Sequence, residues 1–255
     1  MTADTTTANP TELLVYTISR LLAGVRHVAV GASSPIPGAG ALLTRAQSEQ
    51  AGGQRTRISI LGSQKHNSFT NGGVELFDLA GQGRVDAFFL GGGQIDAQAN
   101  INLVGTGDYP STEVRWSGSF GSAYLYFMVP RVILFRWEHS RRTLVDQVDF
   151  ISAPGRSEPG VYRPGGPIAL ITNLCLFDYN KHSGRFALRS LHPGHTLEEV
   201  QDQTGFDFDC PARVPITPLP DAHRLALLRG PVAEQIADTY PAFARQVFGM
   251  ESPTN

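Results

Sequence analysis

The sequence predicts an α/β fold with an open, largely parallel sheet, helices on both faces and an antiparallel extension. Between residues 25 and 137, short continuous apolar runs alternate with segments whose apolar residues recur at helical spacing. That alternation is typical of buried parallel strands with helical crossovers. After residue 144, apolar runs are joined by turn sequences such as residues 180–184, which indicates antiparallel strands. The 255 residues, 41% of them hydrophobic, are enough for one sizeable core.

The first half of the chain contains most of the predicted helical crossovers. Residues 1–10 are predicted to be a disordered tail, and residues 11–23 a helix capped by Thr11. The strands predicted here are residues 25–30, 57–61, 85–90, 113–116 and 132–137, and the helices are residues 40–50, 74–80 and 122–129.

The second half contains the antiparallel extension and the C-terminal helices. Apolar runs at residues 145–151, 168–177 and 185–191 predict strands or a sheet edge. Thr196, followed by Glu199 three residues later, is a capping-box sequence and predicts a helix to residue 203. Two further helices are expected at residues 221–229 and 232–248. We expect residues 11–249 to form a single domain, followed by a tail at residues 250–255.

Composition excludes several classes of function. The 21 basic residues are balanced by 23 acidic ones, which excludes a chain-wide basic surface for nucleic acid. The longest uncharged apolar stretch, residues 123–129, is too short to cross a bilayer, so we expect no membrane association and a cytoplasmic protein. Cys175 and Cys210 lack zinc-site spacing, and we predict no metal site. We expect Cys175 to be a core residue and neither cysteine to be a nucleophile.

Four predicted strands lead into small or glycine residues. These segments are residues 31–34, 62–64, 91–94 and 117–122. Ligands of open α/β sheets bind outside the carboxyl ends of the strands, where glycine allows close approach to the backbone, although tight turns also need glycine. Four such segments together favour a ligand cleft. Neither a dinucleotide fingerprint nor a P-loop is present.

Several motifs occur in a characteristic order. Residues 89–96 read Phe-Leu-Gly-Gly-Gly-Gln-Ile-Asp, and they precede Asn-Ile-Asn at 100–102, Gly-Ser-Phe-Gly at 118–121 and a segment at 148–155. This order resembles the β subunit of class I coenzyme A transferases, the glutaconate and 3-oxoacid type, over about residues 13–229. The resemblance implies that family's fold and an α-subunit partner in a heterodimer or heterotetramer. It also implies coenzyme A as part of an acyl-CoA substrate, with no permanently bound cofactor.

The sequence departs from the transferase pattern at the nucleophile. Transferases of this type have Ser-Glu-Asn-Gly, whose glutamate forms a glutamyl-CoA intermediate. Here the segment reads Gly62-Ser63-Gln64-Lys65-His66, and the neutral amide of Gln64 cannot replace a carboxylate nucleophile. Glu75, the next acid, is expected to open a helix. The missing glutamate resembles the β subunit of steroid ring-cleaving CoA-thioester hydrolases, in which the resemblance implies that the α subunit supplies the carboxylate.

Three alternative functions are consistent with this resemblance. The leading one is hydrolytic ring opening of a cyclic diketone CoA thioester in steroid-type catabolism. The others are CoA transfer to a carboxylate and a non-catalytic CoA-binding or structural role.

We expect the backbone N–H groups of Gly118, Phe120 and Gly121 to hold developing negative charge, with Phe120 replacing a glycine of the family motif. Gln64 and His66 are further candidate catalytic residues; His66 could act as an acid or base, and a solvated loop is the alternative. The candidate substrate- or CoA-binding residues are Ser63, Gly91, Gly92, Gly93, Gln94, Asp96, Asn100, Asn102 and Ser119. The asparagines could equally satisfy turn backbone.

Overall fold

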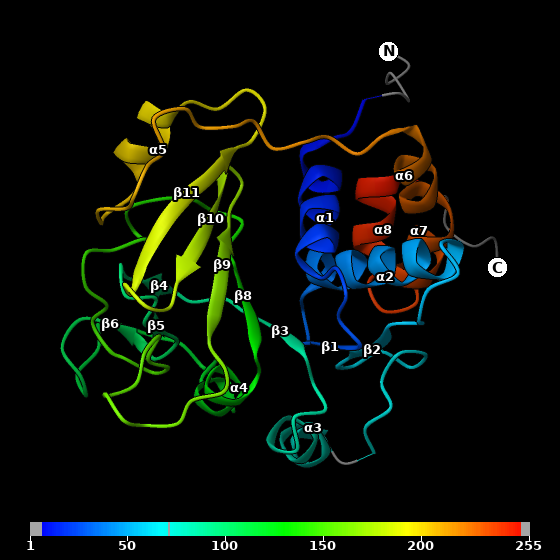
Figure 1. Cartoon of the computed structure of the whole chain (residues 1–255). Helices are drawn as coiled ribbons and strands as arrows, with labels where there is room; N and C mark the ends of the chain where they lie inside the picture. Colours follow the sequence, from blue (N-terminus) through cyan, green and yellow to red (C-terminus); the bar gives the residue numbers. More distant parts are fainter. Residues whose placement is uncertain (1–6, 71, 251–255) are drawn as a thin grey trace. The chain divides into compact units, whose positions relative to one another are not determined.

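The chain forms two compact units, and the first is built from both ends of the sequence. The computed structural model describes residues 7–70 and 72–250. The first unit comprises Met1–Gly72 and Pro218–Asn255, and the second comprises Gly73–Thr217 (Figure 1). The expectation of one domain over residues 11–249 stays a prediction.

The first unit combines two parallel strands with helices. Strands β1 (His27–Val30) and β2 (Arg57–Ile60) pair in parallel. The helices are α1 (Pro10–Leu21), α2 (Pro35–Gln50), α6 (Ala222–Leu227), α7 (Ala233–Ala237) and α8 (Pro241–Phe248), with a π-helical segment, Leu228–Val232, between α6 and α7. Helix α1 packs closely on α2 at Gly40, where a Cβ atom would overlap the side chain of Ile18. This contact requires glycine at that position.

The second unit contains a five-stranded sheet segment in the order β11-β10-β9-β8-β3. Its strands are β3 (Ala87–Leu90), β8 (Arg131–Phe135), β9 (Pro167–Ile171), β10 (Cys175–Asn180) and β11 (Arg185–Leu191). The pairs β3–β8 and β8–β9 are parallel, and β9–β10 and β10–β11 are antiparallel. The predicted α/β class with its antiparallel extension is confirmed.

The remaining elements of the second unit are short. They are helices α3 (Gly72–Gly81), α4 (Ser122–Met128) and α5 (Leu197–Gln203), and the antiparallel pairs of β4 (Gln94–Ile95) with β5 (Ile101–Asn102) and β6 (Gly105–Thr106) with β7 (Val114–Arg115). The expected strand at residues 113–116 is therefore only β7, outside the main sheet.

Three further expectations were wrong in detail. Residues 145–151 form no strand, because their backbone bonds to the β4 region: Val145 N–H donates to the Ile95 carbonyl (3.0 Å) and Asp149 N–H to the Gln94 side chain (3.0 Å). The run at residues 168–177 is two strands separated by a turn in which the Thr172 hydroxyl accepts from two backbone N–H groups. The C-terminal helix at residues 232–248 is broken before Pro241.

Helix α1 begins earlier than expected. Its cap is Asn9 rather than Thr11, because Asn9 and Glu12 form a reciprocal capping box. Residues 7–10 are therefore ordered by this helix start, while the rest of the expected N-terminal tail, residues 1–6, and residues 251–255 lie outside the described residues. No helix in the described part of the chain is long and apolar enough to cross a membrane.

Candidate functional site

The loop after β2 is folded on itself, in the first unit. The Ile60 N–H donates to the His66 carbonyl at 2.8 Å, and the His66 N–H donates to the Ser63 hydroxyl at 3.0 Å. Ser63 is thereby buried and engaged in the turn, whereas Gln64 is exposed. No Asp or Glu occurs between residues 57 and 71, so this loop carries no carboxylate.

His66 is the titratable group of this loop. Burial lowers its pKa, and the nearby Arg45 lowers it further, while Asp238 raises it. The net direction favours a neutral imidazole near pH 7, which can accept a proton. Its Nε2 atom is buried and has no hydrogen-bond partner among the described residues.

The glycines after β3 allow close packing in the second unit. The Gly93 N–H donates to the Asn102 carbonyl at 2.9 Å, and a Cβ atom on Gly93 would overlap the ring of Trp116. A Cβ atom on Gly92 would lie 2.6 Å from the Gln94 carbonyl oxygen, and one on Gly91 would lie 3.1 Å from that of Phe135. Close packing within the protein therefore explains why glycine occupies these three positions.

Four predicted polar ligand groups gather around β4 and β5. Asn102 Nδ2 donates to the Gln94 side-chain oxygen at 2.8 Å, and Asn100 Nδ2 donates to Asp96 at 3.0 Å. Asp96 also accepts from the backbone N–H groups of residues 98 and 100, and Asn100 accepts from that of Gly155. All four side chains are buried. They hold the loops together, and their substrate-binding role stays a prediction.

The loop before α4 presents free backbone donors. Gly118, Ser119 and Phe120 are exposed, and Gly121 has a φ of 66° at the start of the helix. Within the described chain, the N–H groups of these four residues donate to no acceptor. The loop is braced by the Ser122 hydroxyl, which donates to the Ser119 carbonyl at 3.2 Å. These groups are therefore available to a ligand that carries negative charge.

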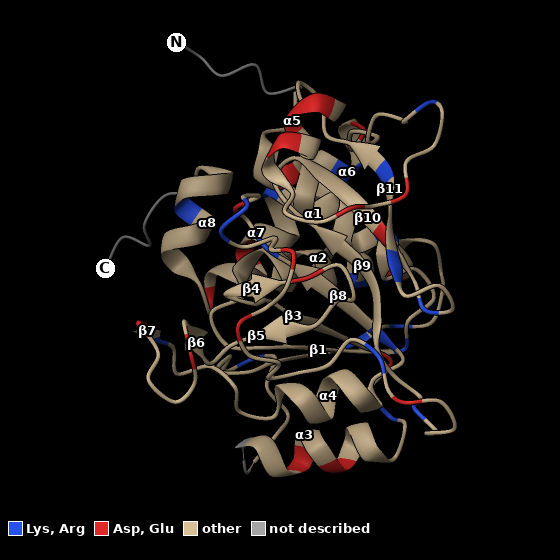
Figure 2. Ribbon diagram, turned by 90° about the vertical axis from the view of Figure 1, so that its left-hand side faces the viewer, with Lys and Arg blue, Asp and Glu red and all other residues tan. Residues whose placement is uncertain are grey.

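Phe120 is held beside these donors by an aromatic cluster that sequence analysis missed. Its side chain is 80% exposed, and its ring centroid lies 5.5 Å from that of Phe77 on α3. The Tyr124 ring on α4 lies edge-on to that of Phe77, with the ring centroids 5.6 Å apart, and α3 and α4 lie side by side (Figure 2). A Cβ atom on Gly73 would lie 2.8 Å from Phe120, and one on Gly121 would overlap Phe77. Spacing along the sequence gives no signal for a cluster that joins two helices.

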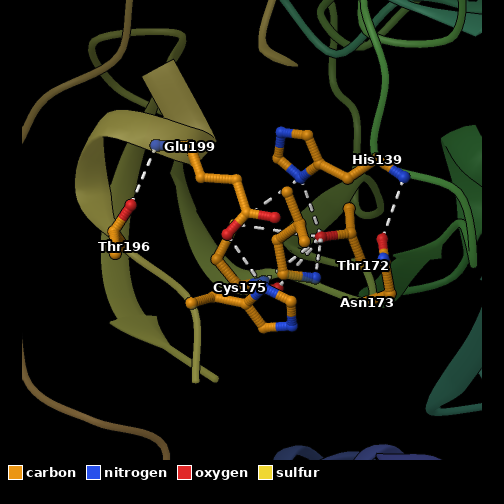
Figure 3. A network of polar contacts seen from close by, with 8 residues as sticks. His139, Thr172, Asn173, Cys175, Thr196 and Glu199 are labelled. Carbon is orange, nitrogen blue, oxygen red and sulfur yellow. Dashed lines mark hydrogen bonds and ion pairs between the residues drawn. The ribbon is translucent and has the colours of Figure 1, made fainter. Parts of the chain in front are cut away.

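A buried histidine network lies elsewhere in the second unit. His139 Nδ1 lies 2.9 Å from the Thr172 hydroxyl, and its Nε2 lies 2.9 Å from that of Thr204. His192 bonds to Thr217 and to the Thr172 carbonyl. Burial lowers the pKa of both histidines to about 4, so both are neutral at pH 7. Figure 3 labels His139 and Thr172, the part of this network that also includes Asn173 and Cys175.

Cys175 lies in the same network and is not a nucleophile. Its Sγ is 3.8 Å from His139 Nδ1, but burial raises the pKa of the thiol to about 12. A thiol that stays protonated does not attack. The expected core role of Cys175 is confirmed by its complete burial.

Comparison with known proteins identifies the family. The profile described as coenzyme A transferase matches residues 12–203. The chain is 37% identical over 153 residues to the B subunit of the 3-oxoadipate CoA-transferase of Pseudomonas knackmussii, covering 58% of each chain. It is 29% identical over 159 residues to the cholesterol ring-cleaving hydrolase IpdB subunit of Rhodococcus jostii, covering 61% of this chain and 62% of the relative. These alignments span less than two thirds of either relative.

Solved structures share the fold over a greater length. A single-residue variant of the decarboxylase AibA/AibB superposes with a TM-score of 0.71 at 26% identity, covering 87% of this chain and 94% of the other. Glutaconate coenzyme A-transferase from Acidaminococcus fermentans gives a TM-score of 0.76 at 20% identity, covering 96% and 99%. With the profile match over most of its length, the chain belongs to the coenzyme A transferase family and resembles the family's β subunits.

Proposed function

We propose that the chain is the β subunit of a two-subunit enzyme that hydrolytically opens the ring of a cyclic diketone CoA thioester of steroid type. One observation carries the proposal. The loop after β2 has an exposed neutral Gln64 and no carboxylate, so this chain has no nucleophile there for a glutamyl-CoA intermediate. The likeness to the IpdB subunit supports the hydrolytic alternative.

The proposed chemistry adds one water and leaves the thioester intact. The oxygen of water adds to a ring ketone, and the bond from that carbon to the carbon between the two carbonyls breaks. The electron pair passes to an enolate, which is then protonated, and the attacked carbon becomes a carboxylate. The free N–H groups of Gly118, Phe120 and Gly121 would hold the enolate, a role in which one donor contributes roughly 3 kcal/mol. In this proposal the base is a carboxylate of the α subunit.

CoA transfer is the second candidate. It is favoured by the 37% identity to the B subunit of a 3-oxoadipate CoA-transferase, and it requires a glutamate from outside this loop. A non-catalytic CoA-binding or structural subunit is the third candidate.

The deciding experiment uses the chain purified together with its α partner. A panel of acyl-CoA esters, with and without acetate or succinate, is incubated and followed by mass spectrometry. An acyl-CoA that gains one water supports ring opening. New acetyl- or succinyl-CoA contradicts it and establishes transfer, and loss of carbon dioxide would instead match the decarboxylase AibA/AibB. Absence of turnover across cyclic diketone esters also counts against the proposal and favours the non-catalytic role.

Gln64→Ala tests whether the residue at this position takes part in covalent catalysis. If the reaction proceeds without covalent attack from this loop, the hydrolytic rate stays within about threefold of wild type, the scale of a surface substitution. A loss of roughly a thousandfold or more, the scale of losing a nucleophile, would overturn the proposed mechanism. Circular dichroism of both proteins verifies that the fold is unchanged.

A further inference from the structure

A cavity of about 780 Å³ lies in the first unit, away from the loop after β2. It is formed by the ends of α1 and α2, the start of α6 and the loops that lead into β1 and β2. Val25, Arg26 and Thr56 in its wall directly precede the two strands, so the cavity lies at their amino ends. The loop after β2 follows the opposite, carboxyl end of the strand. The two places are therefore distinct.

The wall of the cavity is positively charged. Arg20, Arg26, Arg224 and His223 line it, and none of its described lining residues is Asp or Glu. The neighbouring Asp221 pairs with Arg224 and caps α6. Even with that carboxylate counted, basic groups outnumber acidic ones at the wall. Basic groups that gather from three separate segments favour an anionic ligand.

Arg20 and Arg224 lie beside Tyr16, and neither is needed to satisfy the carbonyl groups at the ends of α1 and α2. At the end of α1 the carbonyls of Arg20 and of the cap residue Leu22 accept from Ala23 and Val25 N–H, and carbonyls in the last turn of α2 accept from the N–H groups of residues 51–53. These helix ends are thus closed by backbone. The guanidinium groups of Arg20 and Arg224 instead lie 5.9 and 5.8 Å from the Tyr16 ring centroid. Two cations from α1 and α6 beside one ring form a preformed site for an anion next to an aromatic surface.

We propose that this cavity, which we call the basic cavity, binds a phosphorylated nucleoside. A single phosphate occupies far less than 780 Å³, whereas that volume lies within the range of small-molecule sites, about 300–1,000 Å³. The arginines meet the phosphates, and Gln47 and Gln54 offer amide groups to a sugar or base. Such a ligand is either a free nucleotide or the phosphoadenosine end of coenzyme A.

Isothermal titration calorimetry on the full chain tests the proposal without measuring turnover. Its outcome is therefore independent of the proposed hydrolase activity. We expect ADP to bind saturably with a Kd below about 1 mM and to weaken as salt rises. Adenosine and inorganic phosphate should each bind at least about tenfold more weakly, the equivalent of one lost interaction of about 1.4 kcal/mol. Absence of saturable ADP binding, or equal binding of phosphate alone, would overturn the proposal.

Variants locate the binding. Arg20→Gln and Arg224→Gln should each weaken ADP binding about tenfold, and Ala23→Glu should abolish it by placing a carboxylate in the wall of the cavity. Arg245→Gln is the matched control, because Arg245 is exposed on α8 of the same unit and outside the cavity. Unchanged affinity in all three cavity variants would refute the assignment.

Competition separates the two sources of ligand. If coenzyme A displaces ADP from the wild type, and if the Ala23→Glu variant binds neither, the cavity takes the nucleotide end of coenzyme A. If ADP binds and coenzyme A does not displace it, the ligand is a free nucleotide. Both results support a phosphorylated nucleoside as the ligand.

Discussion

At the scale of single residues, aromatic side chains pack against glycines of the candidate site and leave no room for a Cβ atom. Gly93 packs under Trp116, and Gly121 packs against Phe77. From the sequence, a glycine that follows a strand predicts room for a ligand, but here the room is taken by a side chain. The glycine and its aromatic neighbour are separated along the chain, so sequence spacing does not reveal which explanation applies. Phe120 is the informative exception, because it stays exposed beside free N–H groups.

Gly93→Ala should destabilise the protein. The added methyl group meets the Trp116 ring, and overpacking of this kind costs about 1–3 kcal/mol. The matched control is Gly118→Ala, where the new Cβ atom would lie 3.7 Å from Leu103 and where the free energy of unfolding should change by less than about 1 kcal/mol. Urea unfolding measures both; equal stability of the two variants would contradict the packing explanation.

At the scale of elements, α1 is joined to the C-terminal part of the chain by an ion pair whose carboxylate is buried and whose arginine is partly exposed. Glu12 is fully buried and accepts from Arg229 Nε at 2.6 Å and from Nη2 at 2.9 Å. The same carboxylate accepts from the Asn9 N–H at 2.8 Å, so it closes the helix start as well. One side chain thus joins the helix cap to the segment after α6.

Arg229→Gln should be strongly destabilising. It leaves a buried carboxylate without its cation, a loss of about 3–5 kcal/mol in comparable pairs. The exposed pair of Arg224 with Asp221 is the comparison, and Arg224→Gln should cost less than about 1 kcal/mol. Urea unfolding of both variants at pH 7 measures the difference, and similar losses would show that burial of Glu12 does not set the cost.

Local sequence patterns predicted an element correctly where the residues of that element and its adjoining turn determine its structure. β11 was predicted with its observed bounds at residues 185–191, since its alternating pattern and the preceding turn are local. Residues 145–151 were predicted wrongly, because an equally apolar run bonds to Gln94 and Ile95 instead of to a sheet strand. The side chains of Gln94 and Asn102 were identified from the family motif, but their mutual hydrogen bond was visible only in the structure.

At the scale of the whole molecule, buried neutral histidines couple stability to pH. His139 and His192 have a pKa of about 4 in the folded chain because burial disfavours their charged form. Their ordinary pKa of about 6.5 applies when the chain unfolds. A lowered folded pKa means that the unfolded chain takes up protons first as the pH falls. The contribution of these neutral histidines to the free energy of unfolding is therefore fully present above about pH 6.5 and is lost progressively down to about pH 4.

Between pH 7.5 and pH 5, the free energy of unfolding should fall by about 2 kcal/mol for each of these histidines. His192→Gln should remove about half of the fall attributable to the pair, whatever its effect on stability at pH 7.5. His182→Gln is the control, because His182 is exposed in the turn between β10 and β11. Urea titrations at the two pH values give the differences; a His192→Gln protein with an unreduced pH dependence would disprove this origin.

Because the first unit is built from both ends of the chain, its two parts leave the ribosome at different times. Residues 73–217 are synthesised as one uninterrupted stretch, so the second unit has all its residues before translation ends. Residues 7–72 leave the ribosome earlier but must wait for residues 218–250, among them Arg229, the partner of Glu12. During that interval α1 holds a carboxylate without its cation, and α2 lacks its packing against Leu228–Val232 and α7. A premature stop before residue 229 would leave that exposed surface permanently and make the shortened protein a target for chaperones and proteases.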